Sequence, residues 1–313
     1  MSTIWALSRQ LKRKEISPVD LVQSLLERIN NQNPTLNAYV TVTREQAIEA
    51  ARIAETEIIK GHYRGPLQGI PIGLKDLILT QGIRTTMGSK IFQDHIPDKD
   101  AEIVTYLKKA GTIILGKLHT HEFAYGPTGD RSYFGSAKNP HNPLKITGGS
   151  SSGAGAAVAG ELALAAIGTD TGGSVRIPAA ACGVVGLKPT VGSVSAEGVF
   201  PLSETLDHVG PLTKTVVDNA LVFKALLNDE KGLRTFSPSE IEDFDLATAR
   251  IGIPKRYFLE DLEDEVRQAF NRSAKQFETA GAQIIEIDVP NLEEILWGQS
   301  VVQMSEAFAI HEE

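Results

Sequence analysis

A glycine-rich turn at residues 168–183, GTDTGGSVRIPAAACG, contains hydroxyl groups and charges that a segment built only for packing would not need. Ser174 follows two glycines there, so its hydroxyl could attack a carbonyl carbon as a nucleophile. The backbone N–H groups of Thr171, Gly172 and Gly173 could converge on one concave surface, because glycine has no side chain to block it. Donors in that arrangement stabilise the oxyanion that forms during acyl transfer. The turn therefore predicts a nucleophile and an oxyanion hole.

Cleavage of an amide also needs a group that carries a proton from the nucleophile to the leaving nitrogen. Ser174 lies in GGSVR and not in a G-x-S-x-G elbow, so this base need not be histidine. Lys75 is embedded in a strongly apolar run, PIGLKDLIL, where burial would lower its pKa and keep its amine neutral. A second serine could relay the proton, and GGSSSG offers three: Ser150, Ser151 and Ser152.

Two other glycine patterns imitate nucleotide-binding motifs. Residues 111–118, GTIILGKL, have the spacing of a phosphate-binding loop, but Leu118 replaces the required Ser or Thr and the run is strand-like. Residues 153–160, GAGAAVAG, imitate a dinucleotide fingerprint, but Val158 stands where the third glycine or alanine belongs. We therefore expect a strand in the first run and a helix of small residues in the second.

The histidines and the single cysteine offer weaker alternatives. The spacing of His119, His121 and Glu122 in HTHEF could suit a metal, but no other His or Cys cluster completes a ligand set. We expect a solvated polar turn there instead. Cys182 lies among small apolar residues in AAACGVVG, which favours a buried structural cysteine over a nucleophile.

Three motifs taken together resemble the amidase signature family. They are PIGLKDLI around Lys75, the Gly-Ser-rich run from GGSSSG to GLKPT at residues 148–190, and GPLTKTV at residues 210–216. The resemblance is collinear over essentially the whole chain. It implies a Ser–Ser–Lys triad in which Ser174 forms the acyl-enzyme, Ser150 is the bridging serine and Lys75 is the catalytic lysine.

The resemblance also implies roles for the residues around the triad. Those that match the oxyanion-hole segment are Thr171, Gly172 and Gly173. Ser151 matches a supporting hydroxyl, although capping of a turn or helix is an equal alternative for Ser151 and Ser152. We expect Asp170 and Arg176 to brace the turn by an ion pair or by hydrogen bonds to the backbone. GGSSSG differs from the commoner GGSSGG by Ser152, which leaves the triad positions intact.

The implied activity is that of an amidase that hydrolyses a small-molecule carboxamide through an acyl-Ser174 intermediate, without a metal or organic cofactor. A second interpretation is the glutaminase subunit of the glutamyl/aspartyl-tRNA amidotransferase, which hands ammonia to partner subunits. In that glutaminase the segment after EFA typically resembles MGSSTENSAF. Here it is YGPTGDRSYFGSAKNP, which favours a stand-alone amidase. A third interpretation is a catalytically silent fragment or binding protein.

The elements that must position these residues alternate between strand and helix patterns. This predicts an α/β fold, the amidase-signature fold, with a central mixed β-sheet covered by helices on both faces. Ser17 is the expected N-cap of the first long helix, with Pro18 at its first position. Helices are expected at 17–34, 43–61, 100–111, 153–161, 213–229 and 263–281, and strands at 65–82, 112–118, 162–170, 249–255 and 282–290. The pattern predicts a loop at Leu227–Ala249.

The bulk properties limit the class of protein. The 313 residues are expected to form a single domain, 1–313, which lacks the C-terminal part of longer family members and so exposes apolar surface. A net charge of −8 without a basic run argues against direct binding of nucleic acid or an anionic membrane. One cysteine, no signal-peptide core and no span of roughly 18 apolar residues predict a soluble cytoplasmic protein. A homodimer is left open.

Overall fold

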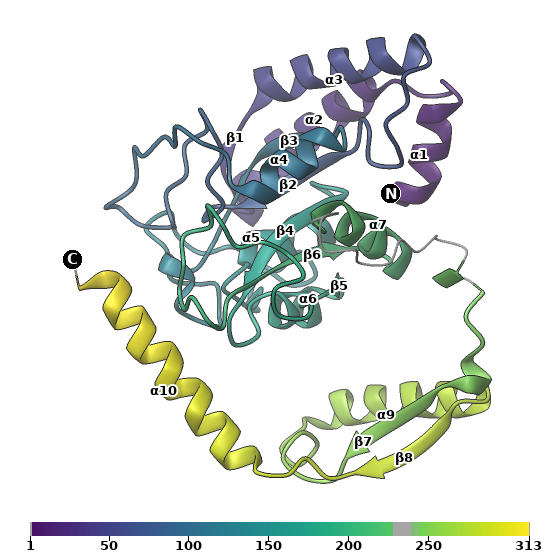
Figure 1. Cartoon of the computed structure of the whole chain (residues 1–313), viewed down its shortest axis with the longest axis vertical. Helices are drawn as coiled ribbons and strands as arrows, with labels where there is room; N and C mark the ends of the chain where they lie inside the picture. Colours follow the sequence, from purple (N-terminus) through teal and green to yellow (C-terminus); the bar gives the residue numbers. More distant parts are fainter. Residues whose placement is uncertain (1, 228–239, 242, 313) are drawn as a thin grey trace. The chain divides into compact units, whose positions relative to one another are not determined.

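The computed structural model describes residues 2–227, 240–241 and 243–312 of the chain (Figure 1). The chain divides into two compact units, Met1–Thr235 with Val302–Glu313, and Phe236–Val301. The expectation of one domain over 1–313 stays a prediction. Most of the loop predicted at Leu227–Ala249 lies outside the described residues.

Three helices open the larger unit: α1 (Ile4–Lys12), α2 (Pro18–Leu36) and α3 (Arg44–Ile59). The Ser17 side chain accepts hydrogen bonds from the N–H groups of Val19 and Asp20, so the predicted N-cap is confirmed. Helix α2 packs against α3, and its apolar stripe is buried.

The larger unit contains a six-stranded mixed sheet in the order β1-β3-β2-β4-β6-β5, which confirms the predicted fold class. Its strands are β1 (Tyr39–Val42), β2 (Pro71–Lys75), β3 (Ile113–Leu118), β4 (Ala165–Asp170), β5 (Val185–Gly186) and β6 (His208–Thr213). The central strand β2 is parallel to both β3 and β4, whereas the outer pairs are antiparallel. β2, β3 and β4 are buried along their whole length, as expected for parallel strands that are covered on both faces.

Helices cover this sheet in two groups. Helix α5 (Ser152–Ala159) packs on β2, β3 and β4 and on helix α6 (Arg176–Cys182). Helix α7 (Val216–Leu226) packs on β4, β5 and β6 and on α1 and α4 (Glu102–Lys109). The phosphate-loop imitation at residues 111–118 is therefore strand β3, and the dinucleotide imitation at residues 153–160 lies in helix α5, as predicted.

The direction of the strands determines where the polar residues lie. β2 ends at Lys75 and β4 ends at Asp170, and the two strands are parallel neighbours. The carboxyl ends of parallel neighbours meet at the same edge of a sheet, where α/β proteins commonly bind ligands. The fold thus brings the lysine and the glycine-rich turn together.

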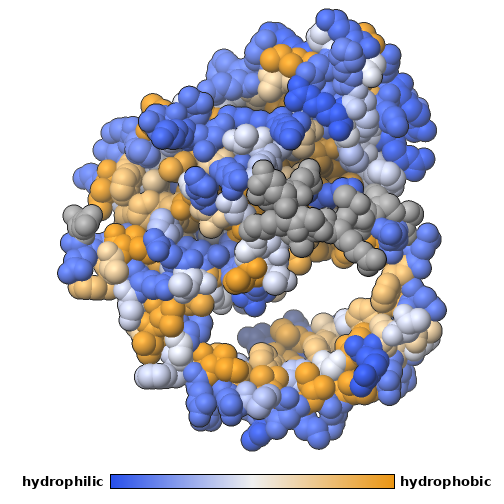
Figure 2. All heavy atoms as spheres, viewed as in Figure 1, coloured by the Kyte–Doolittle hydropathy of each residue, from blue (hydrophilic) through white to orange (hydrophobic). Residues whose placement is uncertain are grey.

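The smaller unit contains the parallel strands β7 (Arg250–Pro254) and β8 (Gln283–Ile287) with helix α9 (Asp264–Thr279), close to the predicted bounds. Helix α10 (Leu292–His311) follows. Exposed apolar surface is visible over these elements (Figure 2), and its large side chains include Val266, Phe277, Ile295 and Trp297, the last 71% exposed. Among the described residues, no helix is both long enough and apolar enough to cross a membrane.

Candidate active site

Lys75 lies at the end of β2 and is fully buried. Its Nζ donates to Ser150 Oγ at 2.7 Å and to Thr169 Oγ1 at 2.7 Å. Both partners are hydroxyl groups, which can accept from the amine or donate to it as its protonation changes. The predicted lysine–serine contact is therefore present in the geometry, and Thr169 is a second partner that the sequence did not indicate.

Burial lowers the pKa of Lys75 to about 7, although the nearby carboxylates of Asp207 and Asp170 oppose this by favouring the charged form. An unperturbed lysine would be almost entirely protonated at neutral pH. A pKa near 7 leaves a large neutral fraction, so the amine can act as a base.

Ser150 begins the segment that carries the serines into the site. The Gly149–Ser150 peptide bond is cis, and Ser150 O accepts from the N–H of His121 at 3.0 Å. The neighbouring Ser151 N donates to Ser174 O at 3.2 Å. This backbone contact places the turn that carries Ser174 directly beside the Lys75–Ser150 pair.

Ser174 lies on the turn between β4 and α6, with 8% of its surface exposed. The turn needs glycine at the position before it. Gly173 has a φ of +133°, and a Cβ there would lie 2.8 Å from Cδ1 of Ile177. The glycine directly before Ser174 is thus favoured by its backbone conformation.

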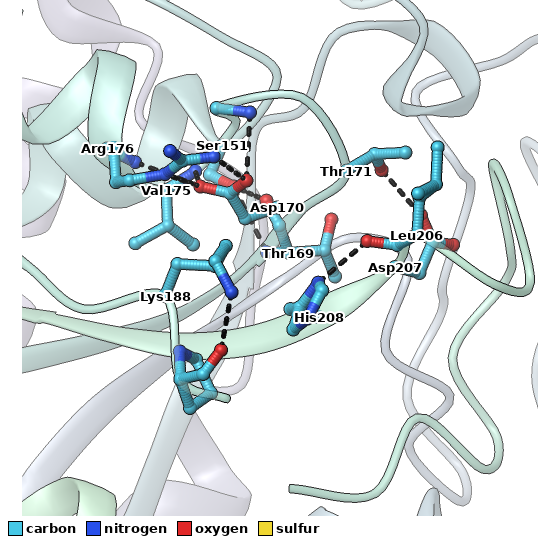
Figure 3. Close-up of polar contacts among 12 residues, drawn as sticks. Ser151, Thr169, Asp170, Thr171, Val175, Arg176, Lys188, Leu206, Asp207 and His208 are labelled. Carbon is cyan, nitrogen blue, oxygen red and sulfur yellow. Dashed lines mark hydrogen bonds and ion pairs between the residues drawn. The ribbon is translucent and has the colours of Figure 1, made fainter. Parts of the chain in front are cut away.

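The carboxylate of Asp170 stabilises this turn through hydrogen bonds and an ion pair (Figure 3). It accepts from the N–H groups of Gly173, Val175 and Arg176 at 2.8, 3.1 and 3.3 Å. It also forms a bidentate ion pair with the Arg176 guanidinium at 2.9 and 2.8 Å. Burial alone would raise the pKa of Asp170, but the hydrogen bonds and charge of Arg176 outweigh burial and lower it. The expected bracing contacts are both present.

The hydrogen bond to Asp170 matters for the predicted oxyanion donors. The N–H of Gly173 already has an acceptor in Asp170. In the described part of the chain, the N–H groups of Gly172 and Ser174 donate to no protein acceptor. These two groups are therefore available to a bound oxygen, whereas Gly173 contributes mainly through its backbone conformation.

Asp207 is a residue that the sequence analysis missed. One of its carboxylate oxygens accepts from the hydroxyl of Thr171, 36 residues earlier in the chain (Figure 3). The other accepts from the N–H of Leu202 at 2.8 Å. The contact with Leu202 is local, but the contact with Thr171 and the effect on Lys75 come from distant parts of the chain, so no local pattern marks this residue as part of the site.

The prediction of a solvated polar turn at HTHEF is wrong, because both histidines are buried. His119 Nδ1 lies 2.8 Å from Ser152 Oγ, and its Nε2 lies 2.7 Å from Gly135 O. Burial lowers the pKa of His119 to about 4, so the ring is neutral. Ser152, the departure from the commoner motif, supplies the hydroxyl that this buried imidazole needs. Among the described residues, no group of three His, Cys, Asp or Glu side chains could hold a metal.

The remaining serine and the cysteine have structural contacts. Ser151 Oγ donates to Thr169 O at 3.1 Å and accepts from Thr169 N at 3.2 Å, and it makes no capping hydrogen bond to α5. It therefore ties the start of α5 to β4. Cys182 is buried, and burial raises the pKa of its thiol to about 12. The prediction of a structural cysteine is confirmed.

A family model described as Amidase matches residues 20–312. A glutamyl-tRNA(Gln) amidotransferase subunit from Geobacter sp. strain M21 is 42% identical over 313 residues, which is 98% of this chain and 64% of that protein. The chain thus spans less than two thirds of the length of this curated relative.

Solved structures give the same picture. The native peptide amidase from Stenotrophomonas maltophilia superposes with a TM-score of 0.89 at 32% identity, covering 98% of this chain and 66% of that one. A glutamyl-tRNA(Gln) amidotransferase subunit from Thermotoga maritima superposes with a TM-score of 0.83, also at 32% identity and with the same coverage.

Proposed function

Because this chain belongs to the amidase family, we propose that it hydrolyses a carboxamide to a carboxylate and ammonia or an amine through an acyl-enzyme on Ser174. The observation that carries the proposal is the buried contact between Lys75 and Ser150, with a lysine pKa of about 7, beside the turn that carries Ser174. A buried amine of this kind is the base that an unactivated serine requires.

In the first half of the reaction, Ser174 Oγ attacks the amide carbon and its proton passes through Ser150 to neutral Lys75. The oxygen of the tetrahedral intermediate is held by the N–H groups of Gly172 and Ser174 and by the segment that begins at Thr171. Lys75 then returns the proton through Ser150 to the leaving nitrogen. The C–N bond breaks, and the acyl group remains on Ser174.

In the second half, water attacks the acyl carbon while the same relay takes its proton. The ester bond breaks, Ser174 regains its proton, and the carboxylate leaves. Each proton removed is returned within the cycle, so these steps need no cofactor. Asp170 and Arg176 keep the turn in shape and do not exchange protons in this scheme.

A second candidate is the glutaminase component of a tRNA amidotransferase, which would have partner subunits. It is favoured by the 42% identity to the amidotransferase protein of Geobacter. Residues 125–140, YGPTGDRSYFGSAKNP, still favour a stand-alone amidase. The two candidates share the chemistry at Ser174 and differ in the amide and in the destination of ammonia. A cytoplasmic location remains part of this proposal.

Reaction with a fluorophosphonate probe, followed by peptide mapping by mass spectrometry, tests the activated serine. We expect labelling at Ser174 in the wild-type chain and none in Ser174→Ala, with equal circular dichroism spectra. Glutamine, aliphatic and aryl carboxamides would then be compared as substrates. A folded wild-type chain that takes up no label would contradict the proposed activity.

A further inference from the structure

The loop between Phe200 and His208 directly precedes β6, and the last turns of α10 contact this loop. Glu306 of α10 accepts hydrogen bonds from the hydroxyl of Ser203, and from Thr205 through its N–H at 3.1 Å and its hydroxyl at 2.7 Å. These contacts lower the pKa of Glu306, with the Ser203 hydrogen bond the largest cause, so the side chain is a carboxylate. One side chain thus holds two positions of the loop.

The same loop determines where Asp207 lies. The carbonyl of Ser203 accepts from the N–H groups of Leu206 and Asp207, at 3.1 and 2.8 Å. Asp207 in turn accepts from the N–H of Leu202. Ser203 is fully buried, so its backbone and hydroxyl are both held in place, the first by the loop and the second by Glu306.

Asp207 connects this loop to the reaction centre. Its carboxylate accepts from the Thr171 hydroxyl, at the start of the proposed oxyanion segment. Its charge also favours the protonated form of Lys75 more than any other carboxylate does. A displacement of the loop would therefore change both the oxyanion segment and the proton affinity of Lys75.

Aromatic contacts hold the same turns of α10 on the larger unit. The ring of His311 lies 4.7 Å from the ring of Phe123 and 5.9 Å from that of Phe200, measured between centroids. Ala307 is buried in an apolar cluster with Leu202. Glu306 therefore makes its hydrogen bonds from a turn of α10 whose next residue, Ala307, is buried and whose C-terminal end packs on aromatic rings.

We propose that Glu306 is a positioning residue for the amidase site: through Ser203 and Thr205 it fixes Asp207, which in turn holds Thr171 of the oxyanion segment. This inference rests on the proposed function of Ser174 and adds a residue from the far end of the chain to its machinery. The hydrogen bonds of Glu306 go to Ser203 and Thr205, neither of which belongs to the triad, so its effect is transmitted through the loop.

Amide hydrogen exchange measured by mass spectrometry tests the physical link without any substrate. We expect Glu306→Ala to speed exchange in residues 199–208 and also in residues 168–176, with a smaller change in Glu306→Gln, whose amide oxygen can still accept. Glu312→Gln removes an equal charge from the end of the same segment and should change neither region. Unchanged exchange in residues 168–176 of Glu306→Ala would overturn the proposal, whatever the activity.

The rate of Ser174 labelling tests the consequence for the site. We expect Glu306→Ala to slow labelling by about three- to tenfold, and no further slowing when it is added to Asp207→Asn, since both act through one carboxylate. Additive effects of the two substitutions would contradict the proposed route through Asp207. If the wild-type chain is not labelled, the proposed function fails, and the exchange experiment still decides the positioning role.

The pH at which labelling is half-maximal separates positioning from a loss of folded protein. Charged or titratable groups near Lys75 include Asp207, Asp170 and His121. The negative charge of Asp207 favours protonated Lys75. Moving that charge away in Glu306→Ala, or removing it in Asp207→Asn, should therefore shift the midpoint to lower pH. A lower rate with an unmoved midpoint in Glu306→Ala would contradict the proposal.

Discussion

Two buried lysines lie on neighbouring strands, and their surroundings explain why one is proposed as the base and the other is not. Lys75 on β2 and Lys117 on β3 are both fully buried, and burial lowers their pKa values to about 7 and about 8. Leu74 pairs with Lys117 in the parallel register, so the two lysine side chains point to opposite faces of the sheet. Burial and a lowered pKa are common to both regions.

The partners of the two amines differ. Lys75 contacts the hydroxyl groups of Ser150 and Thr169, and the backbone N–H of the residue after Ser150 donates to the carbonyl of Ser174. Lys117 donates to the backbone carbonyl of Ile78 and to the Thr80 hydroxyl. It also lies near Asp76, whose pKa burial raises to about 6 despite that charge. The Thr80 hydroxyl itself donates to the Ile78 carbonyl at 3.0 Å, and a carbonyl can only accept, so these contacts give Lys117 no route for passing a proton to a nucleophile.

The largest expected effect is that of Lys75→Met on activity. Removing the base should slow labelling and amide hydrolysis on the order of 10³-fold, while the protein stays folded, because a buried amine is replaced by an apolar chain of similar volume. Steady-state rates and thermal unfolding would be measured on the same preparation. Activity of Lys75→Met within tenfold of wild type would contradict the proposal that Lys75, unlike Lys117, acts as the base.

Lys117→Met should do the reverse and lower stability more than activity. Without the lysine, the buried carboxylate of Asp76 loses its nearby positive charge, which should cost about 3 kcal/mol in the free energy of unfolding. The pKa of Asp76 is raised in the folded state, so protonation of its carboxyl group stabilises the folded protein at low pH. This contribution to the free energy of unfolding is lost as the pH rises through about 6. Urea unfolding should therefore show a smaller loss near pH 5 than near pH 8. An equal loss at both pH values would argue against a role for Asp76.

Ser152→Ala tests the residue at which GGSSSG differs from the commoner GGSSGG motif. It leaves the buried Nδ1 of His119 without its hydroxyl partner and should cost about 1 kcal/mol of stability, with a change in rate below threefold. Ser152→Gly restores the commoner motif and adds the flexibility of glycine, so it should unfold slightly more easily than Ser152→Ala. A gain in stability in both variants would show that the hydroxyl does not serve His119.

Much of the fold followed from local patterns. Ser17 and Pro18 marked the start of α2, and continuous apolar runs marked β2, β3 and β4. Strand β6 was missed because HVGPLT contains Gly210 and Pro211, which usually interrupt strands. The structure explains the glycine, since a Cβ at Gly210 would lie 2.0 Å from Leu187 O.

Chemistry alone indicated Ser174 as the candidate nucleophile and Lys75 as the candidate base, whereas the choice of Ser150 among the three serines of GGSSSG came from the family resemblance. The site was not predictable where a partner comes from far along the chain. Glu306 meets Ser203 across 103 positions, and no periodicity links them. The polarity of HTHEF was misread for the same reason, because the hydroxyl of Ser152 that makes burial of His119 tolerable lies 33 residues away.

The pH dependence of Ser174 labelling tests most directly the claim that neutral Lys75 is the base. The rate of reaction with the fluorophosphonate probe would be measured between about pH 5.5 and 9 for the wild type, Lys75→Met and Lys117→Met. We predict a wild-type rate that rises with pH and is half-maximal near pH 7, because the lysine must lose its proton before it can accept one. The same midpoint should persist in Lys117→Met, and the rise should be absent in Lys75→Met. A wild-type rate that does not change with pH, or an unchanged profile in Lys75→Met, would contradict the account.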